Sequence, residues 1–201
     1  LNDHIFPAEF RYINEASIKL GTRLSCLEML LSGTTTCCDG YFLEDAVAEA
    51  VLETGMRAVL AQGVIDFPAP GAPDPARNVE TAAAFVSKWQ DVSDRLTPSI
   101  FCHSPYTCSK ETLVRAKAAA AKAGVRFQIH VAETRGEPDQ IAGANGLSPV
   151  KYLDRLGVLD EKTLISHAVW VDAADIDILA SRKTNISHNP ESNMKLASGV
   201  A

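Results

Sequence analysis

The 201-residue chain lacks several features that would assign it directly to a functional class. Its formal net charge is -6, so it has no basic excess of the kind that binds nucleic acid or an anionic membrane. No run of apolar residues is long enough to predict a membrane-spanning helix. No charged, apolar and small-residue order marks a secretory signal. We therefore expect no nucleic acid and no membrane as partners.

The cysteines lack the spacing of a common class of metal site. The chain has five cysteines, an odd number, and none of them forms a C-x-x-C pair. That pattern argues against a zinc knuckle or a redox dithiol. We interpret the five side chains as reduced, mostly buried thiols of a cytoplasmic protein.

Helical and strand-like patterns alternate along the whole chain, of which 46% is hydrophobic. Regular alternation predicts a parallel sheet with right-handed crossovers. A proline-rich segment at 68–75 predicts a loop. Strands are expected at 34–39, 57–65, 99–102, 125–131, 163–168 and 184–187, and helices at 14–31, 43–53, 77–92, 109–124, 149–156 and 172–180.

The positions of the histidines separate the two parallel folds that fit this alternation. A doubly wound nucleotide-binding sheet should carry G-x-G-x-x-G or G-x-x-x-x-G-K, and neither is present. In a closed barrel all carboxyl ends of the strands face one mouth, where the chemistry takes place. We therefore predict an α/β fold, a partial (β/α)8 TIM barrel with roughly six of its eight βα units, and treat residues 1–201 as one incomplete catalytic barrel. Four of the five histidines stand where predicted strands end: His103, His130, His167 and His188.

The segment around His130 carries the strongest local chemical signal. His130 ends a predicted strand and Glu133 follows three residues later on the emerging loop. A neutral imidazole can ligate zinc there, and a nearby carboxyl group can move a proton. A single histidine at a strand end is commonly structural, and Glu133 could be a solvated loop carboxylate. Four histidines at successive strand ends are harder to explain in that way.

Motifs from near the first residue to the last resemble one branch of the amidohydrolase superfamily, the cytosine/guanine-deaminase and chlorohydrolase-like proteins. Within this branch the chain looks most similar to the 5'-methylthioadenosine/S-adenosylhomocysteine deaminases. The motifs are Ile5-Phe6-Pro7-Ala8-Glu9, Glu28-Met29-Leu30 through Ser32-Gly33-Thr34-Thr35-Thr36, His103-Ser104-Pro105-Tyr106-Thr107-Cys108-Ser109, His130-Val131-Ala132-Glu133-Thr134, Ser166-His167-Ala168, and Asn189-Pro190-Glu191-Ser192-Asn193-Met194-Lys195-Leu196-Ala197-Ser198-Gly199.

The resemblance implies a role for each matching position. His130 matches a ligand of a divalent metal, zinc or another such as iron. Glu133 matches the carboxylate that protonates the ring nitrogen beside the attacked carbon, and His167 matches the histidine that orients the metal-bound hydroxide. His103 matches a residue that contacts the substrate. Arg77 lies near the position of an arginine for the substrate's distal group.

The chain departs from the family pattern at three places. The family's first metal pair, a His-x-His, and its last ligand, an aspartate, have no counterpart here, and His4 stands too early and isolated to replace the pair. Gln62 stands where several deaminases carry an arginine. We interpret Leu1 and Ala201 as cuts through a longer sequence, and we expect the chain alone to be inactive because a catalytic zinc needs about three protein ligands.

Two kinds of function remain open. The first is metal-dependent hydrolysis of a carbon–nitrogen bond in a cyclic amidine, by deamination of an adenine-type nucleoside or base. The alternatives within the family are an s-triazine chlorohydrolase or aminohydrolase and a guanine deaminase. The expected partner is then a small purine-like or triazine-like molecule, with a possible homo-oligomer. The second kind is a non-catalytic fragment that self-associates through unpaired strand edges and exposed apolar surface.

Overall fold

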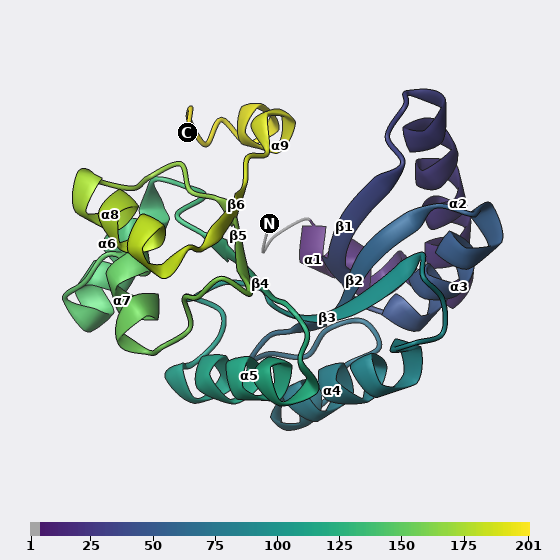
Figure 1. Cartoon of the computed structure of the whole chain (residues 1–201), viewed down its shortest axis with the longest axis horizontal. Coiled ribbons are helices and arrows are strands. Elements are labelled where there is room, and N and C mark those ends of the chain that lie inside the picture. Colours follow the sequence, from purple (N-terminus) through teal and green to yellow (C-terminus); the bar gives the residue numbers. More distant parts are fainter. Residues whose placement is uncertain (1–4) are drawn as a thin grey trace. The chain divides into compact units, whose positions relative to one another are not determined.

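The computed structural model describes residues 5–201, so His4 lies outside the described residues. The chain divides into two compact units, Leu1–Phe101 and Cys102–Ala201. Both units combine strands with helices (Figure 1). The two units are described separately below.

All six predicted strands are present. Within the first unit, β1 pairs in parallel with β2, and the Ser99 hydroxyl of β3 donates to the Leu60 carbonyl of β2 at 3.0 Å. Within the second unit, β4 pairs in parallel with β5, and β5 pairs in parallel with β6. The bounds are β1 Thr36–Tyr41, β2 Arg57–Val64, β3 Leu96–Cys102, β4 Phe127–Val131, β5 Thr163–His167 and β6 Asn185–Ser187.

The strands follow one another in the sheet in chain order, from β1 to β6. His103 directly follows β3 and belongs to the second unit. Its carbonyl accepts from the His130 amide of β4 at 3.2 Å, so β4 follows β3 in this order. In a doubly wound sheet the strand order reverses at a switch point. An unbroken order is the arrangement of a barrel, so the sheet topology supports the predicted partial barrel.

The six predicted helices are also present, and four short elements appear that the sequence did not predict. The predicted helices are α2 Glu15–Leu31, α3 Glu44–Thr54, α4 Asn78–Trp89, α5 Lys110–Ala123, α7 Pro149–Arg155 and α8 Ala173–Arg182. The additional elements are α1 Ile5–Tyr12, the 3-10 helix η1 Pro75–Arg77, α6 Gly136–Asn145 and α9 Pro190–Lys195.

Several helix ends are set by the residues that the sequence suggested. The Ser109 hydroxyl accepts from the Thr112 amide at 3.2 Å and begins α5. The Asp172 carboxylate accepts from the Asp175 amide at 2.8 Å and begins α8. Gly124 ends α5 with a left-handed φ of 74°, a conformation that glycine adopts without strain.

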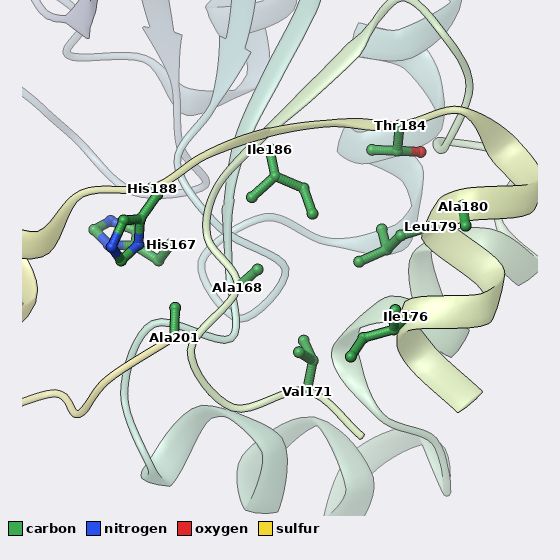
Figure 2. Close-up of a pocket in the computed structure, with 10 residues that line it drawn as sticks. All are labelled: His167, Ala168, Val171, Ile176, Leu179, Ala180, Thr184, Ile186, His188 and Ala201. Atoms are coloured by element: carbon green, nitrogen blue, oxygen red, sulfur yellow. The ribbon is translucent and has the colours of Figure 1, made fainter. Parts of the chain in front are cut away.

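An apolar cavity of about 490 Å³ lies in the second unit and is lined by residues of α8, by residues in and beside β6, and by the end of β5 with the loop after it. Figure 2 shows Ile176 and Leu179 of α8 and Ile186 of β6 around this cavity. His167 and His188 also line it. The cavity therefore reaches the strand ends where the histidines stand.

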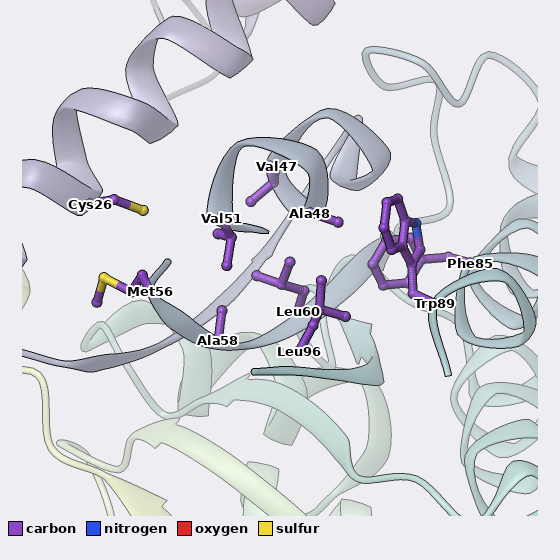
Figure 3. Close-up of a cluster of buried hydrophobic side chains, with 10 residues drawn as sticks. All are labelled: Cys26, Val47, Ala48, Val51, Met56, Ala58, Leu60, Phe85, Trp89 and Leu96. Atoms are coloured by element: carbon purple, nitrogen blue, oxygen red, sulfur yellow. The ribbon is translucent and has the colours of Figure 1, made fainter. Parts of the chain in front are cut away.

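The first unit has a hydrophobic core in which α3 and α4 pack against β2 (Figure 3). Leu60 of β2 is fully buried, and Phe85 and Trp89 of α4 contribute aromatic rings. Burial of such side chains is the main source of stability of a small unit. The remaining buried members of the cluster are Cys26, Val47, Ala48, Val51, Met56, Ala58 and Leu96.

The leucine stripe that predicted α2 does not face this core. Leu20, Leu24, Leu27 and Leu31 are all exposed, and Cys26 is the buried residue of the helix. The periodicity thus predicted the helix correctly, although it marked an exposed face rather than the buried one. No helix within residues 5–201 is long and apolar enough to cross a bilayer.

The five cysteines are free thiols, and three of them are buried, as the sequence led us to expect. Cys38 is exposed on β1.

Candidate active site

Three of the predicted strand-end histidines lie side by side in the second unit. His103 directly follows β3, His130 lies near the end of β4, and His167 is the last residue of β5. The ring centroids of His103 and His130 are 5.4 Å apart, and those of His130 and His167 are 5.3 Å apart. The sheet order alone produces this row, because the three histidines end neighbouring strands.

His103 and His130, two neighbouring members of this row, are held neutral by their surroundings. Burial, with a smaller contribution from the nearby His103 and His167 rings, lowers the pKa of His130 to about 3. Burial likewise lowers the pKa of His103 to about 4. Both imidazoles are therefore neutral at pH 7, which is the form that binds a metal or accepts a hydrogen bond.

Glu133 reaches the row from the loop after β4. Its Oε1 lies 3.5 Å from Nε2 of His167, and its side chain is 18% exposed. A carboxyl group in this position can exchange a proton with a ligand bound over the histidines. The structure thus brings Glu133 together with His167.

A second carboxyl group, Glu137, fixes the backbone beside Glu133. Its Oε1 accepts from the Ala132 amide at 2.8 Å, and its Oε2 accepts from the Glu133 amide at 3.0 Å. Glu137 is 3% exposed, and burial raises its pKa to about 7. The sequence analysis missed this residue, because a glutamate in a loop is ordinarily read as solvated.

The backbone at the end of β5 is bent into a conformation that favours glycine. His167 has φ 80° and Ala168 has φ 48°, both in the left-handed region. The Ala168 amide donates to the Val131 carbonyl of β4 at 3.1 Å and stabilises this turn. Such strained positions persist where the surroundings enforce them, and they are frequent at functional sites.

His103 is held by the turn that follows it. Its Nδ1 lies 2.9 Å from the Thr107 hydroxyl, which in turn contacts the Ser104 hydroxyl at 2.7 Å. The Tyr106 ring stands edge-on to the His103 ring, with centroids 6.2 Å apart. The polar residues of this predicted motif therefore fix the orientation of the His103 ring.

Two further candidates lie in the first unit. Arg77 is the last residue of η1 and is exposed. Gln62 ends the β1–β2 ladder and is buried, and its Oε1 accepts from the Glu44 amide at the start of α3, at 3.3 Å. Gln62 therefore takes part in beginning α3. The role of Arg77 at a substrate stays a prediction.

The donor groups fit a zinc ion in kind. Buried neutral imidazole nitrogen is a common zinc ligand, and His130 lies in the middle of the row. Within residues 5–201, however, no three His, Cys, Asp or Glu side chains are placed to hold one ion together. A complete catalytic zinc site would thus need ligands beyond those that the described part of the chain supplies.

The sequence profile of the amidohydrolase family matches residues 2–201. The chain belongs to the amidohydrolase family. The match covers both units and includes every residue of the histidine row.

Curated relatives resemble the chain over its whole length. The 5-methylthioadenosine/S-adenosylhomocysteine deaminase of Thermodesulfovibrio yellowstonii is 41% identical over 201 residues, which are 100% of this chain and 46% of the relative. The 5'-deoxyadenosine deaminase of Methanothermobacter thermautotrophicus is 42% identical over 202 residues, covering 100% of this chain and 47% of the relative. The chain thus spans less than half the length of these relatives.

Solved structures show the same fold. An adenosine deaminase from Xanthomonas campestris with bound zinc matches with a TM-score of 0.95 and 30% identity, over 100% of this chain and 45% of that protein. A guanine deaminase from C. acetobutylicum with bound guanine matches with a TM-score of 0.89 and 21% identity, over 99% of this chain and 50% of that protein. These matches confirm the α/β class and the partial TIM barrel.

Proposed function

We propose that this chain carries part of the active site of a metal-dependent deaminase that acts on an adenine-type nucleoside or base. The observation that carries the proposal is the row of His103, His130 and His167 at three neighbouring strand ends, with Glu133 beside it. This grouping combines a neutral metal-binding donor with a proton-transferring carboxyl group in one place.

Each residue of the row has its own task in this proposal. Glu133 gives a proton to the ring nitrogen next to the carbon that water attacks, which prepares the amino group to leave as ammonia. Nε2 of His167, 3.5 Å from Glu133, orients the attacking water by a hydrogen bond. His103 contacts the substrate, and the Thr107 hydroxyl keeps its ring in place.

A divalent metal, zinc or iron, would be held in part by His130 and would lower the pKa of water to about 7, so that the nucleophile forms at neutral pH. The zinc in the adenosine deaminase of Xanthomonas campestris supports this assignment. Since residues 5–201 do not provide three grouped ligands, we propose that the chain by itself is inactive.

The choice of an adenine-type substrate rests on the relatives. Two relatives of 41% and 42% identity are named as deaminases of 5-methylthioadenosine/S-adenosylhomocysteine and of 5'-deoxyadenosine. The guanine deaminase and s-triazine alternatives rest on solved structures that share the fold at lower identity, 21% and 19%. Arg77 is proposed to contact the distal group of the substrate. A cytoplasmic location and a homo-oligomer stay predictions.

The test is a chimaera in which this chain replaces the matching segment of the Thermodesulfovibrio yellowstonii relative. Its zinc content is measured by elemental analysis, and ammonia release is measured with adenosine-type nucleosides, guanine and an s-triazine. The matched control is the same chimaera with E133Q, which keeps the side-chain size and removes the acid. The chain alone is measured beside both.

We expect the chimaera to hold about one zinc and to release ammonia from adenosine-type nucleosides, while E133Q reduces the rate about 100-fold or more. The chain alone should do neither. If a folded, zinc-loaded chimaera releases ammonia only from guanine, guanine replaces the adenine-type compound as the assigned substrate. A chimaera that releases none from any substrate would remove the deaminase function, and the non-catalytic, self-associating fragment would then be the better description.

A further inference from the structure

We propose that Glu137 is a positioning residue, which holds the Ala132–Glu133 segment in place and thereby keeps the Glu133 carboxyl group against His167. The inference deepens the proposed function, and its catalytic part rests on that function. Its structural part concerns the chain itself and can be tested without any activity.

The first support is the paired contact of the Glu137 carboxylate. One oxygen accepts from the Ala132 amide at 2.8 Å and the other from the Glu133 amide at 3.0 Å. Two hydrogen bonds that converge on the two oxygens of one carboxyl group fix its direction as well as its distance. The carboxylate therefore restrains two successive peptide groups at the base of the Glu133 side chain.

The second support is that the same segment is held from its other side. The Ala132 carbonyl accepts from the Val169 and Trp170 amides, both at 3.0 Å, in the loop after β5. Ala132 itself has φ 54°, a left-handed conformation that is unfavourable for alanine. The strained segment is thus held on two sides. The Val169 and Trp170 amides hold the Ala132 carbonyl, and Glu137 holds the amides of Ala132 and Glu133.

The third support is the contrast between Glu137 and Asp139. Both are acids in the first turn of α6, where a negative charge is favoured by the helix dipole. Asp139 is exposed, whereas Glu137 is 3% exposed and directed at the loop. Burying a carboxylate is costly unless its oxygens are hydrogen-bonded. If Glu137 acted only through its charge at the start of α6, it could be exposed as Asp139 is. Its burial therefore indicates that its contacts with the loop matter.

The experiment compares the variants E137Q and D139N in this chain by amide hydrogen exchange, followed residue by residue by NMR. Glutamine keeps the length of the side chain, but its amide nitrogen can only donate. One of the two backbone N–H groups therefore loses its hydrogen-bond acceptor. D139N removes the same charge from the same helix turn. We expect the exchange of the Ala132 or Glu133 amide to accelerate about tenfold or more in E137Q and to stay unchanged in D139N.

The second readout uses the chimaera described above. E137Q should lower kcat about tenfold or more with KM within about twofold, because a misplaced proton donor weakens the chemical step rather than substrate binding. E137D, which keeps the charge but is one methylene shorter, should recover only part of this loss. D139N should leave both constants unchanged.

Three outcomes would overturn the positioning role. The first is wild-type exchange at both amides in a folded E137Q. The second is equal acceleration in E137Q and D139N. The third, which needs no variant, is exchange of both amides in the unsubstituted chain as fast as in exposed loops. If amide exchange accelerates in E137Q but not in D139N while the unsubstituted chimaera is inactive, the structural part is supported and the proposed function is rejected. The two failures are therefore distinguishable.

Discussion

Asn193 Oδ1 lies 2.9 Å from His167 Nδ1, and both side chains are almost completely buried. Asn193 belongs to α9. The segment after α9 is held by the Trp170 indole, which donates to the Ser198 carbonyl at 2.7 Å. The contact between Asn193 and His167 therefore joins α9, which follows β6, to the last residue of β5. It also leaves Nε2 of His167 turned toward Glu133.

Replacing Asn193 by alanine should be clearly destabilising. The variant leaves a buried imidazole nitrogen without its partner, and we expect the free energy of unfolding to fall by about 1–3 kcal/mol. Urea denaturation followed by circular dichroism measures this change. The control is Asn145→Ala in α6, where the side chain is exposed and donates to the Ile141 carbonyl, and the expected loss is below about 0.5 kcal/mol. Equal losses in the two variants would contradict the importance of the His167 contact.

The buried Glu137 carboxyl group should make stability depend on pH. Burial raises its pKa from 4.5 to about 7. Between these values the folded chain keeps a proton that the unfolded chain has released, so the free energy of unfolding falls as the pH rises. The contribution is complete below pH 4.5 and is lost as the pH passes about 7, with a total of roughly 3 kcal/mol.

Two histidines act in the opposite direction over much of this range. The pKa values of His103 and His130 are lowered to about 4 and about 3, so their contribution is lost as the pH falls below 6.5. The Glu137 effect is therefore read from the difference between the unsubstituted chain and Glu137→Gln, each unfolded by urea at a series of pH values. That difference should decrease toward higher pH. A difference that is constant with pH would show that Glu137 does not titrate as described.

Gly63 in β2 should not tolerate a side chain. An alanine Cβ at this position would lie 2.8 Å from the Tyr41 carbonyl oxygen of β1, a backbone atom that cannot move aside cheaply. We expect Gly63→Ala to lower the free energy of unfolding by about 1–3 kcal/mol. Gly21→Ala is the control in the same unit, because nothing lies within 4 Å of its Cβ in the middle of α2. It should raise stability by about 0.5–1 kcal/mol. A neutral Gly63→Ala would show that β1 and β2 are farther apart than described.

The fold and the histidine row could be predicted because both follow from regular alternation. Strands alternate with helices along the sequence, and parallel strands in chain order bring their carboxyl ends together. His103, His130 and His167 therefore had to meet once the barrel topology was assumed. Glu133 followed from its position three residues after His130, on the loop that leaves the same edge.

The supporting residues could not be predicted in this way. Helix α6 begins at Gly136 and contains Pro138, so its sequence reads as a loop, and nothing marks Glu137 as buried. The left-handed conformations of Ala132 and His167 are imposed by tertiary contacts, whereas a sequence would suggest glycine there. The sequence placed Asn193 in a matching motif, but it gave no sign of the contact between Asn193 and His167.

The four strand-end histidines should differ in their effect on metal binding. His130 lies between the rings of His103 and His167, whereas His188 is exposed and lines the apolar cavity beside β6. In the chimaera, His130→Gln should lower the zinc content from about one to near zero, because a catalytic site depends on each of about three protein ligands. His188→Gln, the same substitution just after β6, should leave the zinc content unchanged. Elemental analysis after dialysis against a weak chelator measures both. Zinc retained by a folded His130→Gln, or lost from a folded His188→Gln, would contradict this ligand assignment.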